Sequence, residues 1–138
     1  MQHEELKQRV LDEIDRNADH LISVGERIYR DPELGFKEFK TANIVAGEFQ
    51  RLGLGYHEEI AITGLKTVVA GGSAGPTVGV IGELDSVLVA DHEFANPETG
   101  AAHCCGHNAQ ITTMLGVANG LIKSGVLSEL AGNVAFFA

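Results

Sequence analysis

The stretch GPTVGVIGELD, residues 75–85, decides the fold class of this chain. Its β-branched run at residues 77–81 predicts a strand that is buried on both faces, although glycines dilute the run. The strand closes on Glu83 and Asp85, which are two positions apart and therefore point the same way. Open α/β sheets place ligand sites at the carboxyl ends of their strands, which favours a site here. For these two residues alone, a pair of solvated carboxylates is an equally good interpretation.

Helical periodicity precedes this strand. Apolar residues recur at steps of three and four through residues 1–30 and predict a helix that Asp31-Pro32 ends. The stretch KEFKTANIVAGEFQRLG, residues 37–53, predicts a second helix with Gly53 as its C-cap. The first apolar face consists of Leu6, Val10, Ile14, Ala18, Leu21, Ile22 and Ile28, and the second of Phe39, Val45, Phe49 and Leu52.

The remaining elements complete an α/β pattern. Residues 59–72 predict short strands with turns at Gly64 and Gly71-Gly72, and residues 86–106 predict a long irregular loop. A third helix is expected from Asn108, its N-cap, to Lys123, followed by a core strand in GNVAFFA, residues 132–138. The order of helices and strands predicts an α/β fold. A chain of 138 residues has the ordinary size of one domain.

The stretch HCCGHN, residues 103–108, holds both cysteines of the chain. Because Cys105 and His107 are two positions apart around a glycine, their thiolate and imidazole can converge on one cation. These ligands favour zinc or a similar transition metal. Two alternatives stay open: a Cys-His nucleophilic pair, and a buried structural turn.

Charge and composition exclude several classes of protein. The formal charge of −9, from 19 acidic and 10 basic residues, argues against nucleic acid as a partner. The opening MQHEELKQRV is too polar for a secretory signal, and no apolar run is long enough to span a bilayer. We therefore expect a soluble cytoplasmic protein with reduced cysteines and no membrane partner.

Three ordered motifs carry a family resemblance. DPELGFKEFKTA at residues 31–42, GPTVGVIGELDSV at residues 75–87 and HCCGHN before an apolar helix resemble the metal-dependent amidohydrolases. That family includes aminoacylase, hippurate hydrolase, indole-acetyl-amino-acid hydrolases and aminobenzoyl-glutamate hydrolase. The resemblance runs from about residue 5 to the end of the chain. It implies that residues 1–138 are the amino-terminal portion of a catalytic domain with a mixed sheet packed by helices, without the lid or dimerisation domain.

The resemblance also implies the roles of residues. Cys105 and His107 correspond to metal ligands. Asp85 corresponds to an aspartate that does not bind the metal itself but orients a ligand or tunes the metal site. Glu83, His103 and Asn108 correspond to positions that face the substrate or that support the metal ligands. Glu83 and Asn108 match the aminobenzoyl-glutamate and dipeptide-cleaving branch. The full enzyme would hold two divalent ions, zinc first, with manganese, cobalt or nickel as alternatives.

The implied reaction is hydrolysis of the amide bond of a small N-acyl-amino acid or dipeptide by metal-activated water. In relatives, a general-base glutamate follows the strand that matches GNVAFFA. Since residues 1–138 lack it, we expect this chain alone to be inactive. The alternatives are a non-catalytic remnant that binds a metal or a partner, and a Cys-His thiol hydrolase. Self-association into a homo-oligomer is left open.

Overall fold

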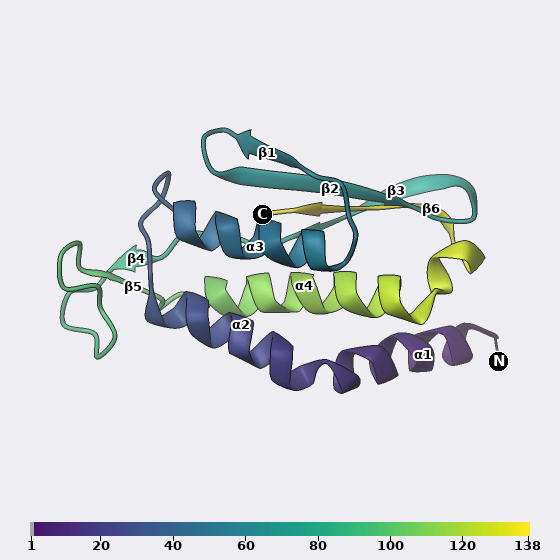
Figure 1. The fold of residues 1–138 in the computed structure, drawn as a ribbon, viewed down its shortest axis with the longest axis horizontal. Coiled ribbons are helices and arrows are strands. Elements are labelled where there is room, and N and C mark those ends of the chain that lie inside the picture. The colour runs from purple at the N-terminus through teal and green to yellow at the C-terminus, as the bar shows by residue number, and fades with distance from the viewer. Residues whose placement is uncertain (1) are drawn as a thin grey trace.

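The computed structural model describes residues 2–138, which combine helices with a mixed sheet (Figure 1). The helices are α1 (Gln2–Arg16), α2 (Ala18–Arg30), α3 (Phe39–Arg51), α4 (His107–Ser124) and the short 3-10 helix η1 (Val126–Glu129). The strands are β1 (His57–Ile60), β2 (Gly64–Ala70), β3 (Ser73–Ile81), β4 (Val87–Leu88), β5 (Ala101–Ala102) and β6 (Ala131–Phe137). Among residues 2–138, no helix has both the length and the apolar character that a membrane span requires.

The main sheet has four strands in the order β1-β2-β6-β3. Strand β6 runs antiparallel to β2 and parallel to β3, so the predicted mixed sheet is confirmed. Helix α4 lies in the crossover that joins the two parallel strands, as parallel pairing requires. The predicted strand in residues 132–138 is also confirmed, and it lies inside the sheet rather than at its edge.

The prediction that β3 is buried on both faces is wrong. Strand β3 is an edge strand whose one neighbour in the described sheet is β6. Its residues are exposed except for the half-buried Val80, and Val78 and Ile81 expose 59% and 70% of their surface. A β-branched run predicts a strand, but its neighbours decide whether that strand is buried.

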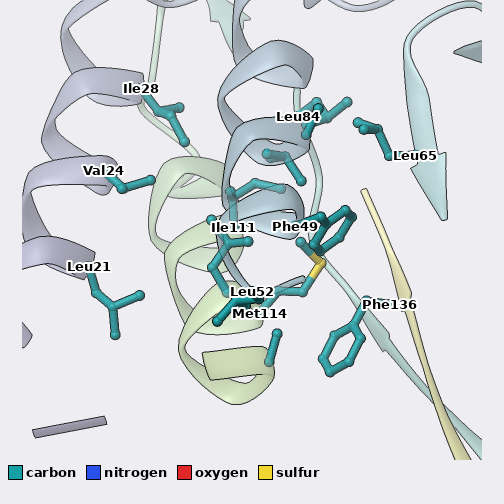
Figure 2. Packing of buried hydrophobic residues seen from close by; sticks show 14 of the residues in the cluster. Leu21, Val24, Ile28, Phe49, Leu52, Leu65, Leu84, Ile111, Met114 and Phe136 are labelled. Atoms are coloured by element: carbon teal, nitrogen blue, oxygen red, sulfur yellow. The ribbon is translucent and has the colours of Figure 1, made fainter. Parts of the chain in front are cut away.

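The helices form two tiers beneath one face of the sheet (Figure 1). Helices α3 and α4 lie against the sheet, and α1 and α2 lie below α4. Figure 2 shows Phe49 of α3, Met114 of α4 and Phe136 of β6 grouped between helices and sheet, and none of them is more than 1% exposed. Burial of side chains of this size contributes about 1.5–3 kcal/mol each to folding.

The predicted first helix is two helices. Residues 2–30 break at Asn17, which separates α1 from α2 and has φ −105° and ψ 9°. The Asn17 side chain donates a hydrogen bond back to the Glu13 carbonyl at 2.9 Å, an alternative to the helical ladder that short polar side chains offer. The placement of Ile22 and Phe39 on apolar faces is wrong, since these residues are 57% and 56% exposed.

Turn chemistry explains which boundaries are correct. At the end of α3, Gly53 has φ +73° and donates to the Gln50 carbonyl, while Leu54 donates to Phe49, which is a Schellman motif. The turn predicted at Gly64 lies instead before it, at residues 61–63. The loop predicted at residues 86–106 contains the short β4–β5 hairpin, which the sequence pattern did not show.

Candidate metal centre

The acidic strand end lies directly beside the beginning of α4. Strand β3 ends at Ile81, and Gly82 donates a backbone hydrogen bond to the Phe137 carbonyl of β6 at 2.9 Å. A Cβ atom at Gly82 would lie 2.9 Å from the Ile111 side chain and 3.2 Å from its Cα. Glycine therefore permits the close approach of α4 to the segment that carries Glu83 and Asp85.

A left-handed turn starts α4. Gly106 has φ +85° and occupies the N-cap position, and His107 is the first helical residue. The prediction of Asn108 as N-cap is wrong, because Asn108 lies inside the helix and no side chain caps this end. The left-handed conformation at this position is one that glycine adopts without strain. Figure 1 shows the β4–β5 hairpin at the same end of α4.

His107 is held between the two carboxylates of the strand end. Its Nδ1 lies 2.8 Å from the Asp85 carbonyl oxygen and 2.8 Å from Asp85 Oδ1. Its Nε2 lies 3.1 Å from Glu83 Oε2. A ring that donates from Nδ1 to a carboxylate has its Nε2 fixed in direction, which is how histidine ligands of metals are commonly held. This direction leaves Nε2 able to bind a cation in place of Glu83.

His103 is the unusual polar residue of this region. It is 6% exposed, and neither ring nitrogen has a hydrogen-bond partner within residues 2–138. Burial lowers the pKa of His103 below its ordinary value, the charge of His107 lowers it further, and Asp85 acts in the opposite direction. Buried polar groups are usually paired, so an imidazole without partners is expected to serve a ligand or an ordered water.

The two cysteines are exposed and free. In the described residues, no hydrogen bond joins Cys105 to His103 or His107. Residues 2–138 also contain no cluster of three or more histidine, cysteine or acidic side chains arranged to hold a metal. The donor chemistry fits a transition metal, with the Nε2 of His107 and the thiolate of Cys105 as ligands. It fits as part of a site that needs further ligands.

A second segment, residues 31–36, supports the acidic strand end. The Glu33 carbonyl accepts hydrogen bonds from the backbone nitrogen of Ser86 at 2.8 Å and from its hydroxyl at 2.7 Å. The Glu33 carboxylate accepts from the backbone nitrogens of Lys40 and Thr41 at the start of α3. This segment therefore connects α3 to the residue that follows Asp85. Its role was not predicted, and the signal in the sequence was the DPELGF motif itself.

A cavity of about 460 Å³ lies against the same strand end. Its lining includes the exposed apolar residues Phe36, Ile60 and Ile81 together with Glu83 and Asp85. Phe36 is a non-glycine residue with φ +62°, a conformation that persists where surrounding contacts enforce it. No pattern in the sequence indicated that this loop and the β1–β2 turn meet beside the acidic residues.

Comparisons with known proteins agree with this arrangement of motifs. No model of a known protein family matches the chain. An IAA-amino acid hydrolase, ILR1-like 4, from Arabidopsis thaliana is 33% identical over 119 residues, which are 84% of this chain and 26% of that protein. The chain thus spans about a quarter of the length of this curated relative.

Two solved structures share the fold. One is a protein from methicillin-resistant Staphylococcus aureus, provisionally assigned as an aminohydrolase, with a TM-score of 0.81, 22% identity and coverage of 94% of this chain and 34% of its own. The other is the Bacillus subtilis YXEP protein, described as a dinuclear metal-binding peptidase from the M20 family, with a TM-score of 0.73 and 23% identity. The match covers 86% of this chain and 34% of the YXEP chain.

By sequence the chain is related to an amidohydrolase of amino acid conjugates, and it shares its fold with a protein described as an M20 peptidase; it matches each over part of its length. The predicted resemblance and the predicted fold class are confirmed.

Proposed function

We propose that this chain is the amino-terminal portion of the catalytic domain of a metal-dependent amidohydrolase. The observation that carries the proposal is the position of His107 at the start of α4, with Nδ1 on Asp85 and Nε2 toward Glu83. The relation to a hydrolase of amino acid conjugates and the fold shared with a dinuclear metal-binding peptidase support it. The substrate class we propose is small N-acyl-amino acids or dipeptides.

The proposed ligands within this chain are Cys105 and His107. Asp85 fixes the ring of His107 from behind, so that Nε2 keeps one direction. The exposed carboxylate of Glu83, the buried imidazole of His103 and the side chain of Asn108 lie on the substrate side or support the ligands. A divalent metal bound here would polarise an amide carbonyl and lower the pKa of a water molecule.

We propose two metal ions in the complete site, with zinc as the first choice. Cysteine, histidine and carboxylate ligands also accept manganese, cobalt and nickel. Residues 1–138 would supply some of the ligands, since the described residues hold no complete cluster of three. The thiol ligand suits a reducing compartment, and we propose the cytoplasm.

Metal content tests this proposal directly. Elemental analysis of the purified protein after incubation with Zn²⁺ and gel filtration should show bound zinc in the wild type. Cys105→Ala and His107→Ala should each lose it, because each removes a ligand. Cys104→Ala is the matched control, since it removes the neighbouring exposed thiol and should retain the metal. Equal zinc in all four proteins, or zinc lost in Cys104→Ala alone, would contradict the proposed ligands.

A thiol hydrolase is the second candidate. It is favoured by the Nδ1 contact of His107 with Asp85, which resembles the way a carboxylate orients a catalytic base. It is disfavoured because no hydrogen bond connects Cys105 to that ring in the described residues. Alkylation of Cys105 would abolish hydrolysis by a thiol enzyme while chelators left it intact, whereas a metal enzyme is inactivated by chelators.

A further inference from the structure

The loop between β4 and β5 packs on the end of helix α2 through aromatic rings (Figure 1). The ring centroid of Phe94 in this loop lies 5.5 Å from that of Tyr29, at an interplanar angle of 62°. The ring of His92 makes an edge contact with the same tyrosine at 6.1 Å. The guanidinium carbon of Arg30 lies 5.1 Å from the centre of the Phe94 ring. Aromatic edge contacts and a cation over a ring are both favourable, so they hold the loop on α2.

Hydrogen bonds make this loop a compact unit that leads into β5. The backbone nitrogen of Phe94 donates to Nδ1 of His92 at 3.1 Å. The side-chain oxygen of Asn96 accepts from two backbone nitrogens later in the loop, at 2.9 and 3.2 Å. The backbone nitrogen of Asn96 donates to the carbonyl of Ala101, the fully buried first residue of β5, at 2.8 Å. The place where Phe94 packs therefore affects the position of β5.

The segment that follows β5 carries the candidate ligand Cys105. Only two residues separate it from Ala102, where β5 ends. The thiol of Cys105 is exposed and free, and no hydrogen bond joins it to His103 or His107 within the described residues 2–138. The backbone of residues 101–106 therefore determines where this thiol lies.

Helix α2 contacts both parts of the candidate site. A Cβ atom at Gly25 of α2 would lie 2.5 Å from the hydroxyl oxygen of Thr112, so α2 and α4 are in close contact there. Tyr29 follows Gly25 by four positions and lies on the same face of α2. These three residues line one groove. Helix α2 thus supports the helix that begins at His107 and, through Tyr29, the loop that leads to Cys105.

We propose that Phe94, packed against Tyr29, is a positioning residue that sets the place of the Cys105 thiol relative to His107. The inference rests on the proposed metal-binding function. The ring of His107 has its own contacts with Asp85, which hold it independently of the loop. The thiol of Cys105 depends on the loop backbone, and a ligand that is loosely held binds a metal weakly. Loss of the Phe94 ring should therefore weaken the thiolate ligand and leave the imidazole in place.

Cobalt binding tests the role of Phe94, because a thiolate bound to Co²⁺ gives a sulfur-to-metal charge-transfer band that an imidazole ligand does not give. All proteins in the test carry Cys104→Ala, so that Cys105 is their one thiol. Titration of this parent protein with Co²⁺ should produce the band. Phe94→Ala should lower the Co²⁺ affinity read from the band by about tenfold or more, the effect of removing groups that support a metal ligand.

Three further variants separate positioning from a general loss of structure. Phe94→Tyr keeps the ring against Tyr29 and should restore the parent affinity. Phe39→Ala is the matched control, since Phe39 is 56% exposed on α3, away from the loop, and should leave the band unchanged. Urea denaturation of the metal-free proteins shows whether each is folded. If Phe94→Ala does not fold, Tyr29→Leu replaces it, because it removes the partner ring but keeps an apolar side chain, and the same loss is expected.

The outcomes distinguish this inference from the proposed function. An unchanged band and affinity in Phe94→Ala would overturn the positioning role and leave the proposed ligands intact. A parent protein without the band would contradict Cys105 as a ligand, and the proposed site and the positioning role would both be overturned. An equal loss in Phe94→Ala and Phe39→Ala would indicate general destabilisation and would overturn the positioning role alone.

Discussion

Asp85 contacts His107 through two different acceptors, its carbonyl oxygen and its carboxylate. The carbonyl is present whatever the side chain, so substitution removes one of the two contacts. His103 shows the opposite situation, since it is buried and its ring nitrogens find no partner in residues 2–138. At the residue scale, the candidate site therefore contains one histidine that is fixed and one whose hydrogen-bonding capacity is free.

Removal of the Asp85 carboxylate should weaken metal binding without abolishing it. Under the proposed function, Asp85→Ala lowers zinc affinity about 10–100-fold, because a ligand histidine loses the group that fixes its orientation. Competition with a chromophoric chelator measures this affinity. Asp15→Ala is the control, since Asp15 is exposed on α1. Unchanged affinity in Asp85→Ala would contradict the positioning role.

A buried carboxylate connects two strained turns near the same site. Glu38 is 6% exposed, and it accepts hydrogen bonds from the Phe36 backbone nitrogen and the Thr63 hydroxyl, each at 2.8 Å. Glu38→Ala leaves both donors unpaired, which should lower the free energy of unfolding by about 1–3 kcal/mol per buried donor. Urea denaturation measures the change, with the exposed Glu58→Ala as control. Equal stability of both variants would refute this role.

At the scale of elements, helices α2 and α4 approach closely at a glycine. A Cβ atom at Gly25 would lie 2.5 Å from Thr112 Oγ1, and that hydroxyl already donates to the Asn108 carbonyl at 2.7 Å. The contact controls how α2 packs on the first turns of α4, which carry His107 and Asn108. The close packing of α2 on α4 therefore requires glycine at position 25.

Gly25→Ala should destabilise the protein by about 1–3 kcal/mol through overpacking. Gly116→Ala on α4 is the matched control, because its nearest neighbour outside the helix backbone is Leu21 Cδ1 at 3.7 Å. That control should be neutral or stabilising by up to about 1 kcal/mol, the gain in helix propensity. Thermal unfolding separates the two outcomes. Adding Thr112→Ala to Gly25→Ala should restore part of the loss.

A polar network connects three helices away from the candidate site. Glu48 of α3 lies 2.9 Å from His20 Nε2 of α2 and accepts from Arg51 Nε at 2.8 Å. Arg51 also contacts the buried Asn119 of α4 at 3.5 Å. Burial raises the pKa of Glu48, but the hydrogen bonds and charges of His20 and Arg51 outweigh it, and the pKa lies below its ordinary value.

This direction fixes the sign of a pH dependence. A carboxyl whose pKa is lower in the folded state stabilises the fold above its unfolded pKa, and the contribution disappears as the pH falls through the folded pKa. Glu48→Gln should therefore be less stable than wild type at pH 7, and the difference should shrink in the acidic range below the usual carboxyl pKa. Urea denaturation at pH 7 and in that acidic range measures the free energy of unfolding of each protein. The exposed Glu26→Gln is the control.

At the scale of the whole molecule, helices cover one face of the sheet and the other face is open (Figure 1). Val68 and Ile81 are exposed on β2 and β3, and the candidate ligands lie at one end of the helical layer. Since the described residues hold no cluster of three metal-binding side chains, the candidate site is incomplete within them.

We expect no hydrolysis of N-acyl-amino acids by the 138-residue protein, with or without added zinc, manganese or cobalt. A discontinuous assay of amino acid release, with a complete amidohydrolase of the same family as positive control, measures this. Turnover at the rate of the complete enzyme, lost in His107→Ala, would contradict the expectation. Turnover that survives His107→Ala would indicate a contaminating enzyme.

The sequence by itself determined the helical segments, the strand β6, the fold class and two of the segments that meet at the candidate site, residues 83–85 and 103–108. These features follow from local periodicity, turn residues and ordered motifs. Such patterns are properties of the sequence and do not depend on which segments pack together in the fold. The break at Asn17 could not be predicted in this way, because the apolar spacing continues across it. The roles of the site residues stay predictions from the family resemblance.

Only the tertiary structure decided that β3 is an edge, that Gly25 faces Thr112, and that Glu33 holds Ser86. It also decided that His103 is buried without a partner among residues 2–138. Each of these depends on contacts between segments far apart in the chain. Burial and hydrogen-bond partners are properties of such contacts, and no local pattern of residues specifies them.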